Sequence, residues 1–464
     1  MRHRTIHGVL AVFCVTVTAT LWIDGALSAA WAQQHEEEGR RHDLASEPIP
    51  LQTDHFPKRP RLLLEIGEDF LNTGQLSRGI RLPTGAVWRP ALWGFGVFRS
   101  SLQSFDDGVN NTDEWANRLD VFGNLRLTGT ERVLIGFRLA DESGGVGYTF
   151  GSGMDDGGQF DVNGRIETLF FEGNIGQLFP FLDDDDSGSF DIGFSVGRQD
   201  LFFQEGILLS DNMDAVGFTR NNLRPPGTSN LRITGLFGWN GVHRNNVDDD
   251  SARLLALLTQ VDLRSSTIEV DAVYTLADAA TGDAFYGGVG AVQRIGRFNT
   301  AFRVNASLPV SGNTMAVTRG VVFFSEISWS PHHTDNLFYV NNFWAIGAYS
   351  PAAIRFGGPL GRTGILFESA GMGRFMAPLS SRADHVVGGA IGHQMFFAHD
   401  RRQLIVELGW RKDTNGIGEA EAALGLRLQQ AVGRRLIVRL DGFGAVREGR
   451  DRAIGGRLET LVKF

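Results

Sequence analysis

One short motif could carry nucleophilic chemistry. Residues 193–197, with Ser195 at their centre, fit the G-x-S-x-G pattern of serine hydrolases. That chemistry needs the serine on a sharp strand-to-helix turn, with Asp and His partners. Here the motif lies inside an alternating apolar and polar run, and no helical pattern follows it. We therefore predict that Ser195 lies within a strand and that the protein is not an enzyme; an outer-membrane hydrolase remains the alternative.

Two polar clusters could attract metal ions, but neither has the spacing of a known site. The run Asp183–Gly188 contains four consecutive carboxylates, and carboxylates are the ligands that Ca²⁺ prefers. Its spacing is not that of a calcium loop, so a solvated acidic turn is favoured. The pair His332 and His333 lacks Cys or Glu at ligand spacing. We predict no metal site and no cofactor.

Arginine forms the most informative charged pattern, because lysine is scarce and arginine recurs beside carboxylates on one face of many segments. A guanidinium group binds carboxylates and phosphates with two parallel hydrogen bonds. One interpretation is a ladder of arginines that guides an anionic solute. The other is a set of Arg–carboxylate networks that stiffen a wall. The sequence favours neither, because water in a wide lumen screens fixed charges.

The composition excludes several classes of protein. The chain has 464 residues, of which 59 are glycine and 34 are phenylalanine, and 42% are hydrophobic. It is too apolar for a disordered chain, and beyond its first residues it lacks the roughly 18 uncharged apolar residues of a membrane-spanning helix. The single cysteine, Cys14, excludes a disulfide scaffold. The net charge of −9 is unfavourable for a nucleic-acid partner.

The first residues predict export. A basic start with Arg2 and Arg4 precedes an apolar run over 9–23, and Ala30-Trp31-Ala32 forms a cleavage site. This pattern is typical of a secretory signal peptide, which we place at 1–32. Residues 33–88 are predicted to form a periplasmic N-terminal segment, partly disordered, in which a brief alternation over 61–88 has no evident partner strand.

The elements that must position the charged residues are strands. In 118–127, Leu119, Val121 and Leu125 share one face, and Arg118 and Asp120 share the other. This period of two predicts a strand with one apolar face and one polar face. The same pattern predicts eighteen strands, near 90–101, 115–128, 132–141, 164–176, 189–200, 212–220, 229–240, 252–264, 266–276, 284–294, 297–308, 320–330, 336–346, 384–398, 403–411, 419–430, 435–446 and 452–464.

Three features favour a membrane barrel over a soluble sandwich. Charges of both signs recur on the polar face, aromatic residues gather near strand ends, and the chain stops at Phe464, an apolar position of its last strand. Lipid permits strands only as a closed barrel. We therefore predict an all-β transmembrane antiparallel barrel over 89–464, with about 18 strands and 16–20 possible. An even number requires that 347–383 form one long loop, external or folded into the lumen.

Three segments carry a resemblance to a known family. Residues 196–220, 127–133 and 341–349 resemble alginate-export-type and porin-like bacterial outer-membrane β-barrels. The resemblance covers the barrel and implies a substrate-permeable pore in the bacterial outer membrane. A terminal Phe464 resembles the membrane-insertion signal by which the last strand of such barrels engages the barrel-assembly machinery.

The expected function is passive passage of a hydrophilic, possibly anionic, small or oligomeric solute. The alternative is a non-conducting scaffold or adhesin whose lumen is filled by salt bridges. The expected partners are outer-membrane lipid, the assembly machinery and the solute, with no nucleic acid. The constriction is expected at Arg355 and Arg362 of the long loop. The expected pore-lining residues are Arg118, Arg126, Arg138, Arg232, Arg303, Arg427, Arg439, Arg457, Asp120, Asp271, Glu326, Glu407, Asp441 and Glu459.

Overall fold

The computed structural model describes residues 61–68, 78–140, 147–150, 157–159, 162–183, 188–310, 312–416 and 419–464. The predicted signal peptide, the tail up to residue 60 and most of the acidic run 183–188 lie outside the described residues. The second of the chain's two units, Arg61–Phe464, contains all the described residues. In the described part of the chain, no helix is long and apolar enough to cross a membrane.

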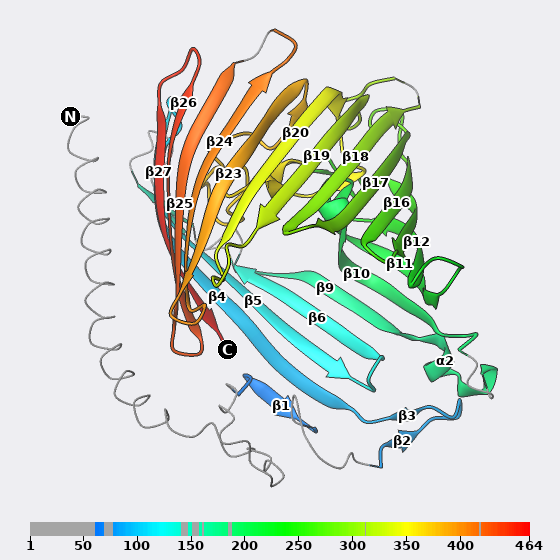
Figure 1. Ribbon diagram of the computed structural model, residues 1–464. Coiled ribbons are helices and arrows are strands. Elements are labelled where there is room, and N and C mark those ends of the chain that lie inside the picture. Colours follow the sequence, from blue (N-terminus) through cyan, green and yellow to red (C-terminus); the bar gives the residue numbers. More distant parts are fainter. Residues whose placement is uncertain are drawn as a thin grey trace, which may run out of the picture. The chain divides into compact units, whose positions relative to one another are not determined.

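The second unit is built around a ring of tilted antiparallel strands, shown in Figure 1. The eighteen barrel strands are β4 (Ala91–Asp106), β5 (Asn111–Arg126), β6 (Arg132–Ala140), β9 (Val162–Asn174), β10 (Ile192–Phe203), β11 (Leu209–Leu223), β12 (Asn230–Asn240), β15 (Arg253–Asp262), β16 (Ser266–Leu276), β17 (Ala284–Ile295), β18 (Phe298–Pro309), β19 (Gly320–Trp329), β20 (Leu337–Tyr349), β23 (Val386–Phe397), β24 (Arg402–Asp413), β25 (Ala420–Val432), β26 (Leu436–Arg447) and β27 (Ala453–Lys463).

Short elements lie between them in the described residues. They are β1 (Leu64–Ile66), β2 (Ile80–Arg81), β3 (Val87–Trp88), β7 (Gly147–Phe150), β8 (Gly157–Gln159), β13 (His243–Arg244), β14 (Val247–Asp248), β21 (Ala353–Ile354), β22 (Ala383–Asp384), α2 (Ile175–Leu178), η2 (Pro180–Leu182), η3 (Gln204–Gly206) and η4 (Gly361–Thr363).

The ring closes where the last strand pairs with the first barrel strand, β27 with β4. This closure leaves no sheet edge there, as a barrel in lipid requires. The predictions of an all-β fold and of eighteen strands are both confirmed. The range 347–383 contains the end of β20, the two-residue strand β21 and the first residue of the two-residue strand β22. It therefore contains no further barrel crossing.

The strands are apolar outside and closely packed inside. On β15, Leu255 and Leu257 are 49% and 55% exposed. Leu254 of the same strand, whose side chain points to the interior, is fully buried. On β18, Phe302 is 43% exposed and the next residue, Arg303, only 2%. A soluble protein would show the reverse pattern. An exterior of large apolar side chains is the face that a barrel presents to lipid.

The C-terminus completes the closure. Phe464 exchanges two main-chain hydrogen bonds with Gly96 of β4, of 2.9 and 3.1 Å. The residues of β4 that precede Gly96 have no partner in β27, because β27 has ended. There, Leu92–Gly94 of β4 pair with β1 instead. The brief alternation in 61–88, which had no evident partner in the sequence, therefore includes a strand that covers the remaining edge of β4.

One hairpin leaves the wall and enters the barrel. β10 pairs with β9 only from Gly193 to Arg198, although it pairs with β11 along its whole length. The separation begins at Gly197, whose φ is +127°; a Cβ there would collide with the carbonyl of Leu169. Only glycine adopts this conformation without strain.

The tip of the hairpin packs against the inner wall on the far side of β12. Leu208, Leu209 and Met213 are fully buried against Leu254 of β15 and Tyr286 of β17. Burial of an apolar side chain of this size contributes about 1.5–3 kcal/mol. The sequence predicts two ordinary strands here, near 189–200 and 212–220, and assigns no role to the residues between them. The inserted tip, residues 204–208, was not predicted.

The close approach of Phe464 to Gly96 gives a test of barrel closure. A Cβ on Gly96 would lie 2.7 Å from the Phe464 ring and 2.8 Å from the Asp120 carbonyl. We expect Gly96→Ala to lower the free energy of unfolding by about 1–3 kcal/mol, the usual cost of overpacking. Urea unfolding in detergent measures it. Gly444→Ala is the control, because nothing lies within 4 Å of its Cβ; equal stability of the two variants would contradict the closure.

Candidate functional site

The segment between β20 and β23, residues 350–385, lies against the inner wall of the barrel and is anchored by one buried carboxylate. Glu407 of β24 is 0% exposed and accepts the main-chain N–H groups of Ile365 and Leu366, at 3.0 and 2.9 Å. It also accepts the hydroxyl of Tyr339. A carboxylate buried without such donors would be costly. Glu407 therefore fixes the segment, which we call the inner loop, on the wall.

Wall arginines hold other parts of the inner loop by its carbonyl groups. Arg118 donates to the carbonyl of Gly371 at 3.2 Å, Arg411 to Ser380 at 2.5 Å, and Arg447 to Pro378 at 2.8 Å. Arg99 reaches Ala370 at 3.4 Å. Arginine can do this and still pair with a carboxylate, because its planar group carries five N–H donors. Part of the arginine pattern in the sequence thus serves to fix the inner loop.

A continuous charged network covers six adjacent strands, β25, β26, β27, β4, β5 and β6. Six arginines of these strands meet three carboxylates of the same strands, and we call this set the arginine band. Its members are Arg99, Arg118, Arg138, Arg427, Arg439, Arg457, Asp120, Asp441 and Glu459. Arg99 and Arg118 are direct neighbours across β4 and β5 and join its two halves. The band itself carries more positive than negative groups.

Ion pairs within the band are short and mostly shielded. Asp441 lies 2.6 Å from Arg427 and 2.7 Å from Arg457. Glu459, which is fully buried, lies 2.5 Å from Arg99 and 3.6 Å from Arg439. Two more carboxylates reach the ends of the band. Glu368 of the inner loop contacts Arg427 at 2.7 Å, and Glu167 of β9 lies 3.6 Å from Arg138 and 2.6 Å from Arg355.

The opposite wall carries an acidic cluster. Arg303 of β18 is 2% exposed and contacts Glu326 of β19 at 3.1 Å and Glu205 at 3.5 Å. Asp271 of β16 accepts the side-chain amide of Gln204 at 2.7 Å, which fixes the hairpin tip. Five strands separate this cluster from the arginine band on one side and three on the other. The cluster comprises Glu205, Glu269, Asp271 and Glu326 around Arg303.

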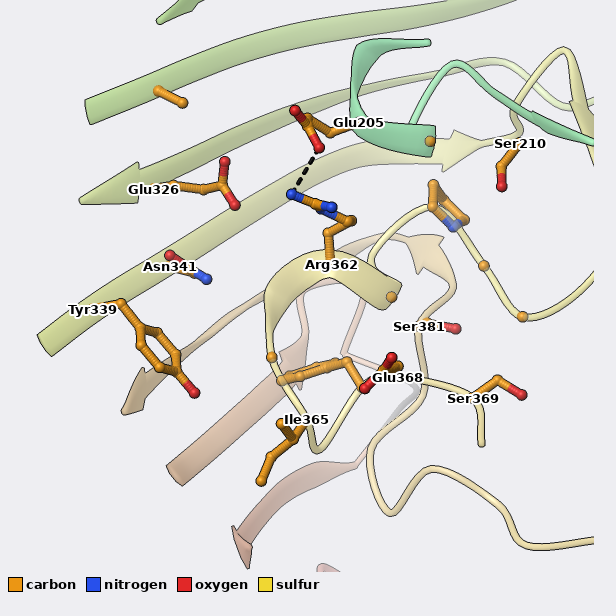
Figure 2. Close-up of a pocket in the computed structure, with 18 of the residues that line it drawn as sticks. Glu205, Ser210, Glu326, Tyr339, Asn341, Arg362, Ile365, Glu368, Ser369 and Ser381 are labelled. Carbon is orange, nitrogen blue, oxygen red and sulfur yellow. Dashed lines mark ion pairs between the residues drawn. The ribbon is translucent and has the colours of Figure 1, made fainter. Parts of the chain in front are cut away.

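Two chambers lie inside the barrel. The larger, of about 880 Å³, is shown in Figure 2 and is lined by the inner loop and by β18–β20. The smaller, of about 540 Å³, lies under the inserted hairpin and is lined by β10–β12 and β15–β16. Phe202 and Glu205 line both chambers. In Figure 2, Arg362 points to Glu205, and its Nη2 lies 2.7 Å from the carboxylate.

The predicted site residues fall into distinct places. Arg232 lines the smaller chamber, whereas Arg126 pairs with Glu68 at 2.5 Å near the first strand, away from both chambers. Glu407 lies under the inner loop, where a solute in the lumen would not contact it. Of the two expected constriction residues, Arg362 lines the larger chamber and Arg355 holds the inner loop to β9. The remaining predicted residues belong to the arginine band or the acidic cluster.

Sequence reasoning missed four residues that these networks require: Gln204, Glu205, Arg99 and Glu167. Arg99 and Glu167 lie on predicted strands. Alternation places Arg99 on the polar face, but Glu167 lies at a register shift between β6 and β9, where alternation counted from Glu172 assigns it to the wrong face. Gln204 and Glu205 lay in a link to which no role was assigned. Three consecutive residues with positive φ, of 51°, 56° and 79° for Gln204, Glu205 and Gly206, shape that link. The sequence signals only the glycine.

The hydrolase-like motif around Ser195 and the pair His332 and His333 lie in an ordinary strand and an ordinary turn. Ser195 lies inside strand β10 and faces the smaller chamber, with Glu172 and Gly217 as cross-strand neighbours. No strand-to-helix turn follows it, as the hydrolase motif would need. Among the described residues, no three His, Cys, Asp or Glu side chains gather as a metal site. His332 and His333 lie in the turn between β19 and β20.

The anchor of the inner loop can be tested directly. Glu407→Gln should weaken the two main-chain hydrogen bonds to Ile365 and Leu366, because hydrogen bonds to a charged group contribute about 1.5–3 kcal/mol each. We expect a protease to cleave the inner loop of this variant at least roughly tenfold faster than that of the wild-type protein. The mobility of the unheated variant on a gel checks that its barrel remains folded. Glu419→Gln is the control, because Glu419 forms an ion pair with Arg450 of the turn between β26 and β27 and, among the described residues, with no group of the inner loop. Equal cleavage of both variants would contradict the anchor.

Comparisons with known proteins identify the fold. No protein-family model and no curated protein matches the sequence. The crystal structure of OpdK from Pseudomonas aeruginosa with vanillate is similar, with a TM-score of 0.55 and 14% identity, covering 80% of this chain and 98% of that chain. OccK2 (OpdF) of the same organism has a TM-score of 0.56 and 9% identity, covering 80% and 97%. OccAB3 of Acinetobacter baumannii has 0.51 and 12%, covering 80% and 99%.

At these identities the similarity concerns the fold. The chain has the 18-strand barrel fold of Occ outer-membrane channels. The exposed apolar exterior described above agrees with that fold, and both are consistent with the predicted location in the bacterial outer membrane.

Proposed function

We propose that the protein is a passive channel for small hydrophilic solutes that carry an anionic group, with a carboxylate as the preferred group. The arginine band is the observation that supports this proposal. Six guanidinium groups form a continuous strip on one inner wall, with three carboxylates among them. Guanidinium binds carboxylates in a bidentate manner, and a strip of like sites lets an anion move in small steps.

The acidic cluster on the opposite wall gives the lumen a direction. A solute between the two walls lowers its electrostatic energy when its anionic end faces the arginine band. Its neutral or cationic end then faces Glu269 and Asp271 of that cluster, which line the smaller chamber. The two chambers, of about 880 and 540 Å³, are large compared with a small aromatic acid, since a cavity of about 150 Å³ already holds benzene.

Two known solutes illustrate the proposed class. OpdK, which shares this fold, was crystallised with vanillate, an aromatic carboxylate. The alginate-export-type barrels, which three segments of this sequence resemble, pass a polyuronate that carries a carboxylate on every sugar. The arginine band suits either, and the inner loop narrows the lumen in favour of the smaller solute. Export and import are both compatible with a passive channel.

A second candidate is a non-conducting scaffold. The inner loop and the hairpin tip fill much of the barrel, and most band arginines already pair with a carboxylate. In that case the ion pairs stabilise the wall and the outer loops bind a partner. Conductance in a planar bilayer separates the two candidates, because only the channel passes a current.

The contribution of the arginine band is testable at Arg439, which lies 3.6 Å from Glu459 and is partly exposed to the lumen. We expect Arg439→Gln to lower the anion-to-cation permeability ratio by about twofold, because one fixed charge acts within a Debye length of about 8–10 Å. The reversal potential in a salt gradient measures this ratio. Arg450→Gln, in an outer turn, is the control. If Arg439→Gln leaves the permeability ratio unchanged, the arginine band does not determine the ion selectivity of the channel.

The inner loop should limit the current. We expect that replacing residues 350–382 by a short Gly/Ser linker raises single-channel conductance several-fold. The reason is that this segment, which connects β20 to β23 in the chain, lies inside the lumen. Retention of a folded barrel is checked by its heat-dependent gel mobility. An unchanged conductance in a folded variant would show that the ions take a route that the inner loop does not narrow.

A further inference from the structure

Glu205 is held in the lumen by a strained and closely fixed backbone. Gln204 and Glu205 adopt φ angles of 51° and 56°, which cost free energy for residues other than glycine. The surroundings compensate for this strain. Tyr349 donates to the carbonyl of Ile207 at 2.9 Å, and the N–H of Ala352 donates to Leu208 at 2.8 Å. The carboxylate of Glu205 therefore occupies a defined place between the two chambers.

The two arginines that Glu205 contacts differ in exposure. Arg303 lies 3.5 Å away, is 2% exposed and also pairs with Glu326. Arg362 of η4 lies 2.7 Å away, and its side chain is 48% exposed to the larger chamber. Glu205 is the one carboxylate within ion-pair distance of Arg362 among the described residues. The guanidinium of Arg362 also lies over the ring of Phe202 at 5.9 Å.

We propose that Glu205 is an internal competitor for the anionic group of the solute, and that the solute's carboxylate replaces Glu205 on Arg362 as it passes between the chambers. This inference rests on the proposed function, whose solute it concerns. An exposed ion pair contributes little net stability, so another carboxylate can exchange with it at small cost. Glu205 keeps its contact with Arg303 after the exchange, so neither charge is left unpaired.

The surroundings of Arg362 suit such an exchange. Ser210, Ser369 and Ser381 line the same chamber and bring hydroxyl groups that can donate to a carboxylate, as Figure 2 shows. Phe202 offers an apolar face beside the guanidinium, on which an aromatic solute can rest. Phe202 and Glu205 line both chambers, so this pair lies at the boundary that a solute moving from one chamber to the other crosses in the proposed exchange.

The test measures binding rather than current, so that it does not depend on an open pore. The probe is 4-fluorobenzoate, titrated into the refolded protein in detergent and followed by ¹⁹F NMR, with 4-fluorobenzamide as its neutral counterpart. We expect Glu205→Gln to lower the dissociation constant of the benzoate about fivefold, and Arg362→Gln to raise it by a similar factor, as one exposed ion pair would. The amide should bind all variants equally.

Two further variants separate direct exchange from a general change of charge. Glu326→Gln removes the same charge from the same chamber but leaves Arg362 with Glu205, so the dissociation constant should stay within about twofold. In the Arg362→Gln background, Glu205→Gln should have no effect on the benzoate. Equal gains in Glu205→Gln and Glu326→Gln, or no gain in Glu205→Gln, would overturn the exchange.

Different results would contradict the proposed exchange and the proposed channel function. If the wild-type protein carries no current but Glu205→Gln still binds benzoate more tightly through Arg362, the channel is wrong and the exchange stands. If the wild-type protein conducts and the dissociation constants do not change, the exchange is wrong and the channel stands. Absence of benzoate binding in every variant also overturns the exchange.

Discussion

Main-chain hydrogen bonding in lipid is the constraint on which the rest of this structure depends. Each strand must pair on both sides, so β27 returns to β4, Phe464 bonds to Gly96, and β1 covers the edge that β27 does not reach. The apolar face of each strand contacts lipid, so the polar face points to the interior. The charged residues are therefore gathered inside by the fold itself, before any function is considered.

Inside the barrel, the same groups fix the wall and shape the lumen. Glu407 and several arginines hold the inner loop, while Gln204 and the apolar residues of the β10–β11 hairpin hold the inserted tip. What remains are two chambers, each lined in part by residues of the acidic cluster, and both by Glu205. Glu205 and Arg362 belong to different inserted elements, and their contact joins these elements at the boundary of the chambers.

The sequence predicted all eighteen strands, because a period of two with one apolar face is a direct signature of a strand in lipid; the range 266–276 agrees with β16 to the residue. It did not predict the inward turn of the hairpin, because residues on either side alternate as in any strand and only the φ of Gly197 and its close approach to Leu169 reveal the bend. Alternation assigned Arg126 and Glu407 to the pore because it shows which face of a strand a residue occupies. It does not show how far along the barrel axis the residue lies, which matters for Arg126, or whether a loop covers it, which matters for Glu407. Partners such as Arg303 and Glu205 are remote in the sheet order, so no local pattern connects them.

Single-channel recording of the refolded wild-type protein, with the reversal potential measured in a salt gradient, tests the central claim most directly. An open pore lined by the arginine band predicts a steady current and a reversal potential of the sign that anion preference gives. A barrel that inserts into the bilayer but carries no current would contradict the channel and favour the scaffold. A cation-selective current would contradict the role assigned to the arginines.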